Sequence, residues 1–127
     1  MVGVMDSFVA VKRWLENRNR GKTFADYFHE CKVNEIAIYG AGDLGRLLYE
    51  ELKCSDICIK YFIDRNGEGI HRIDNIPVIP ISDVYKMEDV DLVIISVSEY
   101  YTEVYNTLTN INPKMRMISL KEAVYEF

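Results

Sequence analysis

Apolar side chains in the first part of the chain recur at helical spacing. The first stripe, with Trp14 beside it, consists of Met5, Phe8, Val11 and Leu15. A second stripe follows Gly21 at positions i, i+3, i+4 and i+7 and consists of Phe24, Tyr27, Phe28 and Cys31. Thr23 precedes this stripe and is suited to cap a helix. The pattern predicts two helices ahead of the first strand, packed on the sheet or on a second copy of the protein.

From Lys32 onward, short apolar runs typical of buried strands alternate with helical segments. Strands are expected at residues 36–39, 57–63, 78–79, 92–97 and 115–118. Helices are expected at residues 44–52, 82–87, 100–108 and 119–125, the last of them capped by Ser119. Residues 65–69 have the composition of a turn, and Pro77 and Pro80 place the short strand between them near a sheet edge.

This alternation predicts parallel strands joined by right-handed crossovers. We therefore expect an α/β fold, a Rossmann-like three-layer domain with about five parallel strands in the order 3-2-1-4-5 and helices on both faces. The domain would span residues 32–127, and residues 1–31 would form an N-terminal two-helix extension. A chain of 127 residues has the ordinary size of one such domain.

A glycine-rich sequence follows the first predicted strand and opens the next helix. It has the spacing G-x-G-x-x-G and reads Gly40, Ala41, Gly42, Asp43, Leu44 and Gly45. Gly40 allows a tight exit from the strand, Gly42 lets the backbone approach a diphosphate, and Gly45 lets the helix lie against the strand. The free N–H groups and the dipole of that helix favour an anion. These residues therefore predict a nucleotide-binding turn.

An acidic residue completes the nucleotide-binding pattern. Asp64 ends the second strand, 19 residues after Gly45, where a carboxylate can accept both hydroxyls of a ribose. Arg65 follows it and could tolerate a 2′-phosphate, but Asp64 favours NAD over NADP. Ser96 comes just after a later strand, at the edge where open α/β sheets bind ligands, and its hydroxyl is suited to a hydrogen bond with a ligand.

One residue of the turn supports a different interpretation. The carboxylate of Asp43 can accept the N–H groups that a phosphate would use, and its charge would repel a diphosphate. The turn could therefore be a structural relic that binds no nucleotide.

The net charge, the cysteine spacing and the apolar runs exclude several classes of partner and location. The net charge of -5 argues against nucleic acid, because affinity for the phosphate backbone comes from lysine and arginine. The three cysteines have no paired spacing, so we expect reduced thiols in a cytoplasmic protein and no metal site. We expect no signal peptide, since no basic segment precedes a long apolar run. The longest apolar stretch, residues 92–97, is too short to span a bilayer.

Several segments together resemble a known group of proteins. Residues 38–45, 62–65, 76–79 and 91–96 resemble the N-terminal nucleotide-binding domains of bacterial polysaccharide-biosynthesis proteins, the nucleotide-sugar dehydratases and epimerases. Similar domains precede sugar acyltransferases. The resemblance covers about residues 34–120. It implies NAD or a UDP-sugar as ligand, with the three glycines at the diphosphate, Asp64 at the ribose and Ser96 in the pocket wall.

The same resemblance leaves the chemistry open. The chain stops where the catalytic domain of the dehydratases would begin, and the tyrosine-x-x-x-lysine match of Tyr49 and Lys53 lies at the wrong end of its helix. We therefore expect a nucleotide-binding module of nucleotide-sugar metabolism without a catalytic residue of its own. The alternatives are a small NAD-dependent oxidoreductase or epimerase active as an oligomer, and an interaction module with a vestigial site. In either case the N-terminal helices could form a homodimer.

Overall fold

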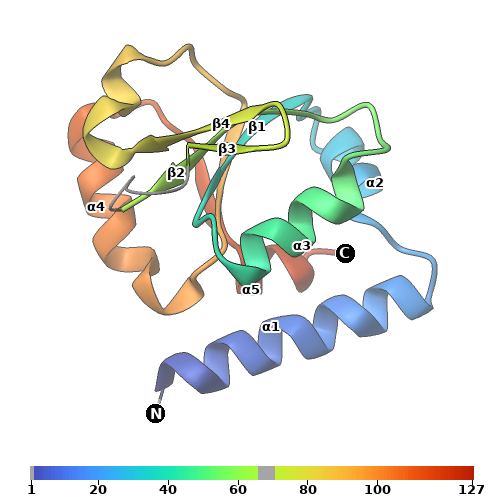
Figure 1. Ribbon diagram of the computed structural model, residues 1–127. Helices are drawn as coiled ribbons and strands as arrows, with labels where there is room; N and C mark the ends of the chain where they lie inside the picture. The colour runs from blue at the N-terminus through green and yellow to red at the C-terminus, as the bar shows by residue number, and fades with distance from the viewer. Residues whose placement is uncertain (1, 66–70) are drawn as a thin grey trace.

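A six-stranded sheet forms the centre of the structure, a computed structural model that describes residues 2–65 and 71–127 (Figure 1). Its order is β3-β4-β2-β1-β5-β6. The strands are β1 Glu35–Tyr39, β2 Cys58–Asp64, β3 Arg72–Ile73, β4 Ile76–Pro80, β5 Leu92–Ile95 and β6 Met117–Ser119. All neighbouring strands are parallel except β3 and β4, which are antiparallel.

The mixed α/β class was predicted, but the strand order differs from the predicted 3-2-1-4-5. The difference arises at the edge, where β3 pairs with β4 through Arg72 opposite Pro77 and Ile73 opposite Ile76. Asp74 turns the chain between them with a φ of 52°, the left-handed conformation that tight hairpins need. A two-residue strand has no apolar run, so the pattern of the sequence did not reveal it. Of the predicted turn at 65–69, residues 66–69 lie outside the described residues.

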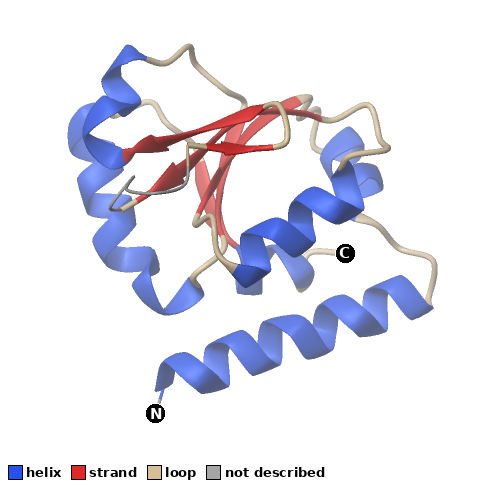
Figure 2. Ribbon diagram, viewed as in Figure 1, coloured by secondary structure: helices blue, strands red, loops and turns tan. Residues whose placement is uncertain are grey.

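Helices cover both faces of the sheet (Figure 2). They are α1 Val2–Asn19, α2 Phe24–Glu30, α3 Asp43–Leu52, α4 Tyr101–Ile111 and α5 Leu120–Val124, with 3₁₀ helices η1 Ile81–Lys86 and η2 Ser98–Tyr100. Two predicted caps are confirmed. Thr23 Oγ1 accepts from Asp26 N at 3.2 Å, and Ser119 Oγ accepts from Glu122 N at 3.0 Å. The helix predicted at 82–87 is the 3₁₀ helix η1, which begins one residue earlier.

The alternation of side chains along β1 separates two apolar cores. Ile36 and Ile38 point toward α1, α2, α3 and α5, whereas Ala37 and Tyr39 point toward α4 and η1. Figure 1 shows α4 and α3 on opposite faces of the sheet. The strands between them are buried on both faces, which is why their sequences are continuous apolar runs.

Helix α1 buries a different face from the one that its apolar stripe predicts. Phe8 and Leu15 of the stripe are 61% and 58% exposed, while Ala10, Trp14 and Asn17 are buried. The Asn17 amide Nδ2 donates to Val124 O at 2.8 Å, so α1 is held on α5 partly by a polar contact. Of the two predicted arrangements, packing of Phe8 and Leu15 on the sheet is not found, and packing on a second copy of the protein stays a prediction. The side chain of Met5 is outside the description.

Candidate functional site

The glycine-rich turn joins β1 to α3, and two of its glycines are required by the fold itself. Gly40 has a φ of 103°, and a Cβ there would lie 2.4 Å from Ser96 Oγ. A Cβ on Gly45 would lie 1.9 Å from the carbonyl oxygen of Gly40. The left-handed φ and the neighbouring Ser96 side chain exclude a Cβ at Gly40, and the close approach of α3 to the end of β1 excludes one at Gly45.

Gly42, the middle glycine, has no such structural reason. Its φ of −86° is open to any residue, and a Cβ there would meet nothing within 4 Å. The residue is exposed and is the N-cap of α3, where serine or asparagine would cap the helix better. The absence of a side chain at this point keeps the space in front of the helix open.

The first turn of α3 presents its backbone without a side-chain cap. Gly42 provides no capping side chain. Asp43 is exposed, and its carboxylate makes no hydrogen bond to this turn within the described part of the chain. The N–H groups that begin a helix have no intrahelical acceptor, so they are available to an anion here. The charge of Asp43 still lies beside them.

Ser96 connects the turn to β5. The residue is 1% exposed, and its hydroxyl donates to Tyr39 O at 2.7 Å, with Gly40 O at 3.5 Å. Its own N–H donates to Tyr39 O at 3.0 Å. Ser96 therefore holds the end of β1 in place beneath the turn, and its proton is already engaged in the protein.

A hollow of about 180 Å³ lies directly over the turn. Its lining consists of Ser7, Gly42, Asp43, Leu44, Ser96, Val97 and Glu99. Helix α1 forms one border, because Ser7 Oγ donates to Glu99 Oε2 at 3.2 Å. No pattern in the sequence predicted this position of Ser7, which lies 92 residues away from Glu99.

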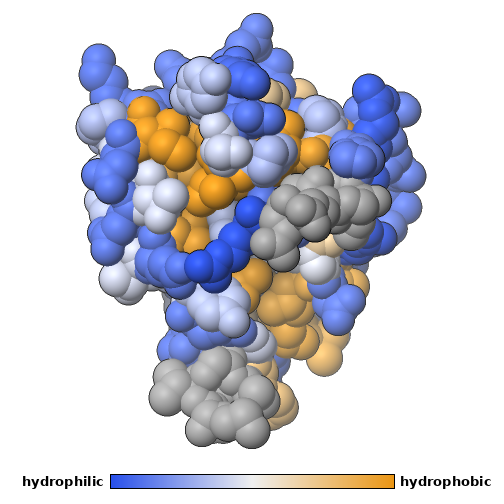
Figure 3. Space-filling view, turned by 60° about the vertical axis from the view of Figure 1, so that its left-hand side comes forward, coloured by the Kyte–Doolittle hydropathy of each residue, from blue (hydrophilic) through white to orange (hydrophobic). Residues whose placement is uncertain are grey.

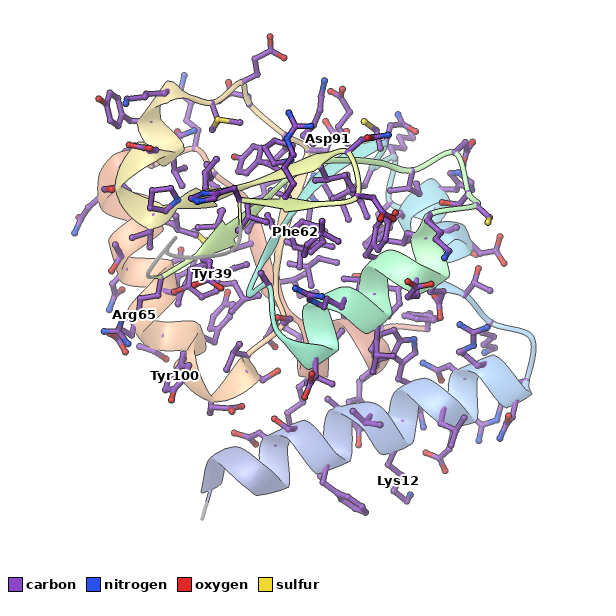
Figure 4. All side chains as sticks on the ribbon, in the orientation of Figure 1. Lys12, Tyr39, Phe62, Arg65, Asp91 and Tyr100 are labelled. Atoms are coloured by element: carbon purple, nitrogen blue, oxygen red, sulfur yellow. The ribbon has the colours of Figure 1, made fainter. Side chains whose placement is uncertain are left out.

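A second hollow, of about 220 Å³, lies on the other side of the β1 end. Its lining consists of Tyr39, Arg65, Ile81, Tyr100, Glu103, Val104 and Thr107. Figure 4 shows Tyr39, Arg65 and Tyr100 at the same end of the sheet. Arg65 Nη2 donates to Glu103 Oε1 at 2.6 Å across this hollow. Figure 3 shows apolar side chains emerging among polar ones on the face formed by α4 and η1.

The charges predicted at the end of β2 surround the hydroxyl of Tyr39. Burial raises the pKa of Tyr39, the Arg65 guanidinium opposes the rise, and the carboxylates of Asp64 and Glu103 add to it. Asp64 is half-exposed at the carboxyl end of β2, beside Pro80 of β4. The structure thus brings Asp64, Arg65 and the glycine turn to one edge of the sheet, as expected where parallel strands end together.

Tyr49 and Lys53 do not face this edge. The Tyr49 hydroxyl hydrogen-bonds the carboxylate of Asp74 in the β3–β4 hairpin, and Lys53 Nζ pairs with Glu50 at 2.6 Å. Among residues 2–65 and 71–127, no three His, Cys, Asp or Glu side chains form a group that could hold a metal ion. Within the same residues, no helix is both long and apolar enough to cross a membrane.

Residues 32–119 match a family model described as C2185-like, N-terminal. The match covers more than two thirds of the chain, from the residue where the apolar pattern changes to the end of β6, so the chain belongs to this family. Helices α1 and α2 lie outside the matched residues. A search of curated proteins finds no match.

Proposed function

We propose that this member of the C2185-like, N-terminal family is a nucleotide-binding module with a Rossmann-like site at the start of α3. The diphosphate of NAD or of a UDP-sugar would lie against the first N–H groups of α3. The observation that carries the proposal is Gly42, whose missing side chain is required neither by its φ of −86° nor by any neighbour within 4 Å. A phosphate group of a ligand that approaches Gly42 closely would explain why this position has no side chain.

The surroundings of the turn fit a ligand larger than a single phosphate. Hollows of about 180 and 220 Å³ flank the end of β1. Small-molecule sites have volumes of roughly 300–1,000 Å³ and lie at the carboxyl ends of strands in open α/β sheets. A ligand with two parts joined by a diphosphate would place one part in each hollow.

The charges of the site favour a ribose without a 2′-phosphate. Asp64 ends β2 where ribose hydroxyls would be bound, and Arg65 is engaged by Glu103 at 2.6 Å. A 2′-phosphate would have to displace that ion pair and lie near two carboxylates. We therefore propose NAD rather than NADP, with a UDP-sugar as the other candidate.

We also propose a metabolic pathway and a cellular compartment for the protein. The resemblance to nucleotide-sugar dehydratases and epimerases supports a role in nucleotide-sugar or polysaccharide metabolism, which we propose for the module as a binding domain without catalytic residues of its own. The three free cysteines are exposed, which suits a reducing compartment, and we propose the cytoplasm.

The test is a comparison of ligand binding and thermal stability in two glycine variants. Gly42→Ser adds a capping hydroxyl, so the melting temperature should stay level or rise slightly while binding of NAD or UDP-glucose is lost. Gly45→Ala is the matched control, because its Cβ would meet Gly40 O and the fold should lose stability whether or not ligand is present.

In the unchanged protein, a ligand at 100 times its Kd should stabilise the fold by about 2.7 kcal/mol. Calorimetric titration with NAD, NADP and UDP-glucose gives the Kd values. A Kd that Gly42→Ser leaves unchanged contradicts a site at this turn, and the absence of binding by any of the three ligands contradicts the proposed function.

A further inference from the structure

An exposed apolar stripe runs along α1 on the side away from the sheet. Phe8, Val11 and Leu15 form it at helical spacing, and Leu47 of α3 extends it with 51% of its side chain exposed. Single exposed apolar residues are ordinary, but contiguous ones on neighbouring helices mark interaction surfaces. Each of these four residues leaves between 38% and 61% of its surface exposed in the described structure.

The stripe borders a hollow between α1 and α3. The hollow has a volume of about 400 Å³, and Val11, Trp14, Leu15, Arg18, Leu47, Glu50 and Glu51 line it. Trp14 closes its floor, since the indole is buried and its Nε1 donates to Glu51 Oε1 at 2.9 Å. The surface is therefore a groove with apolar walls, into which side chains of a partner can insert.

The charges beside the stripe indicate which partner fits. Lys12 and Glu16 lie beside the stripe, one helical turn apart, and Lys12 Nζ lies 3.5 Å from Glu16 Oε2. Figure 4 shows Lys12 pointing away from the body of the protein. If a second α1 runs antiparallel to the first, Lys12 of each copy faces Glu16 of the other. A parallel arrangement would instead bring the two lysines together.

We propose that this stripe is the interface with a second copy of the chain, in which the two α1 helices pack antiparallel about a two-fold axis near their middle. Val11 of each copy then lies against Leu15 of the other, and the Lys12–Glu16 pairs form twice, as a two-fold interface requires. This dimer is independent of the nucleotide site, because it needs neither the glycine turn nor a ligand.

Sedimentation velocity of the full chain without nucleotide tests the interface, from micromolar to hundreds of micromolar protein. The unchanged protein should sediment as a dimer, and Phe8→Glu or Leu15→Glu should raise the dimer Kd at least tenfold. Both side chains are exposed, so circular dichroism should show an unchanged fold. Tyr85→Glu is the matched control, since Tyr85 is 69% exposed on η1, away from the stripe, and its dimer Kd should not change.

Charge reversal tests the antiparallel arrangement. Lys12→Glu alone places two carboxylates opposite each other, and Glu16→Lys alone places two ammonium groups opposite each other, so each variant should dimerise more weakly. An equal mixture of the two variants restores opposite charges and should form a heterodimer. A monomer at every concentration overturns the proposal, and so does a dimer that Phe8→Glu leaves intact. A mixture that associates no better than either variant alone overturns the antiparallel arrangement.

Discussion

Glu51 of α3 binds donors of α1 and α2 that lie 27 to 37 residues earlier in the sequence, and its removal should weaken the attachment of these two helices. Its side chain is 5% exposed. Oε1 accepts from Trp14 Nε1 at 2.9 Å and from Arg18 Nη1 at 2.8 Å, and Oε2 accepts from Phe24 N at 2.8 Å. One carboxylate on α3 thus satisfies donors of α1 and of the first residue of α2.

The cost of Glu51→Ala follows from these contacts. A hydrogen bond to a charged group contributes about 1.5–3 kcal/mol, and the Trp14 and Phe24 donors are partly buried and would lose their acceptor. The Arg18 side chain is 53% exposed, so its ion pair adds about 0.5 kcal/mol. We expect a loss of about 3.5–6.5 kcal/mol, a large part of the 5–15 kcal/mol that is typical of whole domains.

Urea unfolding measures this loss directly, because Trp14 is the only tryptophan in the chain and reports on the contact itself. Fluorescence and circular dichroism should give the same midpoint if α1 unfolds together with the sheet. Glu50→Ala is the control: Glu50 is exposed and, among the described residues, pairs with Lys53 in the adjacent turn, so its loss should change the free energy of unfolding by less than about 0.5 kcal/mol. A Glu51→Ala protein within about 1 kcal/mol of the unchanged one would refute the reasoning.

Two further substitutions test charges at opposite ends of the sheet. Asp43→Asn should lower the Kd for NAD measured by calorimetry, because it removes a carboxylate beside the proposed diphosphate. The difference in Kd between the variant and the unchanged protein should become smaller as salt is added. Weaker binding by the variant would contradict the proposed site. At the other end, the backbone N–H groups of Asn34 and Glu35 donate to Asp91 at 2.9 and 3.0 Å and hold the pKa of that carboxyl below its usual value. A carboxyl whose pKa is lower in the folded than in the unfolded protein stabilises the fold at pH values above its unfolded pKa. This stabilisation is lost as the pH falls through its folded pKa. Asp91→Asn should therefore be less stable than the unchanged protein at neutral pH, by about 1 kcal/mol, and the difference in urea midpoints should vanish on acidification; a difference that persists in acid would contradict this.

The elements that the sequence predicted best are those specified by neighbouring residues. The apolar runs of β1, β2 and β5 and the caps Thr23 and Ser119 depend on residues a few positions apart, and the structure contains them. The edge strand β3 was missed, since two residues carry no periodicity and the hairpin depends on the φ of Asp74.

The buried face of α1 could not be read from its own pattern. The most regular apolar positions, Phe8, Val11 and Leu15, are exposed, whereas Trp14 and Asn17 are buried because α3 and α5 offer them hydrogen-bond partners. Those partners, Glu51 and the Val124 carbonyl, lie 37 and 107 residues away. The sequence of a helix shows how its apolar residues are spaced, but which face becomes buried depends on elements that are distant in the sequence.

The structure shows that the three glycines of the motif do not support nucleotide binding equally. A match counts Gly40, Gly42 and Gly45 equally, yet Gly40 is explained by its φ of 103° and its contact with Ser96, and Gly45 is explained by the close approach of α3 to Gly40 O. Their presence therefore supports the fold and not the ligand. Gly42 alone among the three glycines is open to solvent and has no conformational or steric requirement in the described structure, so the proposed nucleotide site depends on this residue and on the N–H groups behind it.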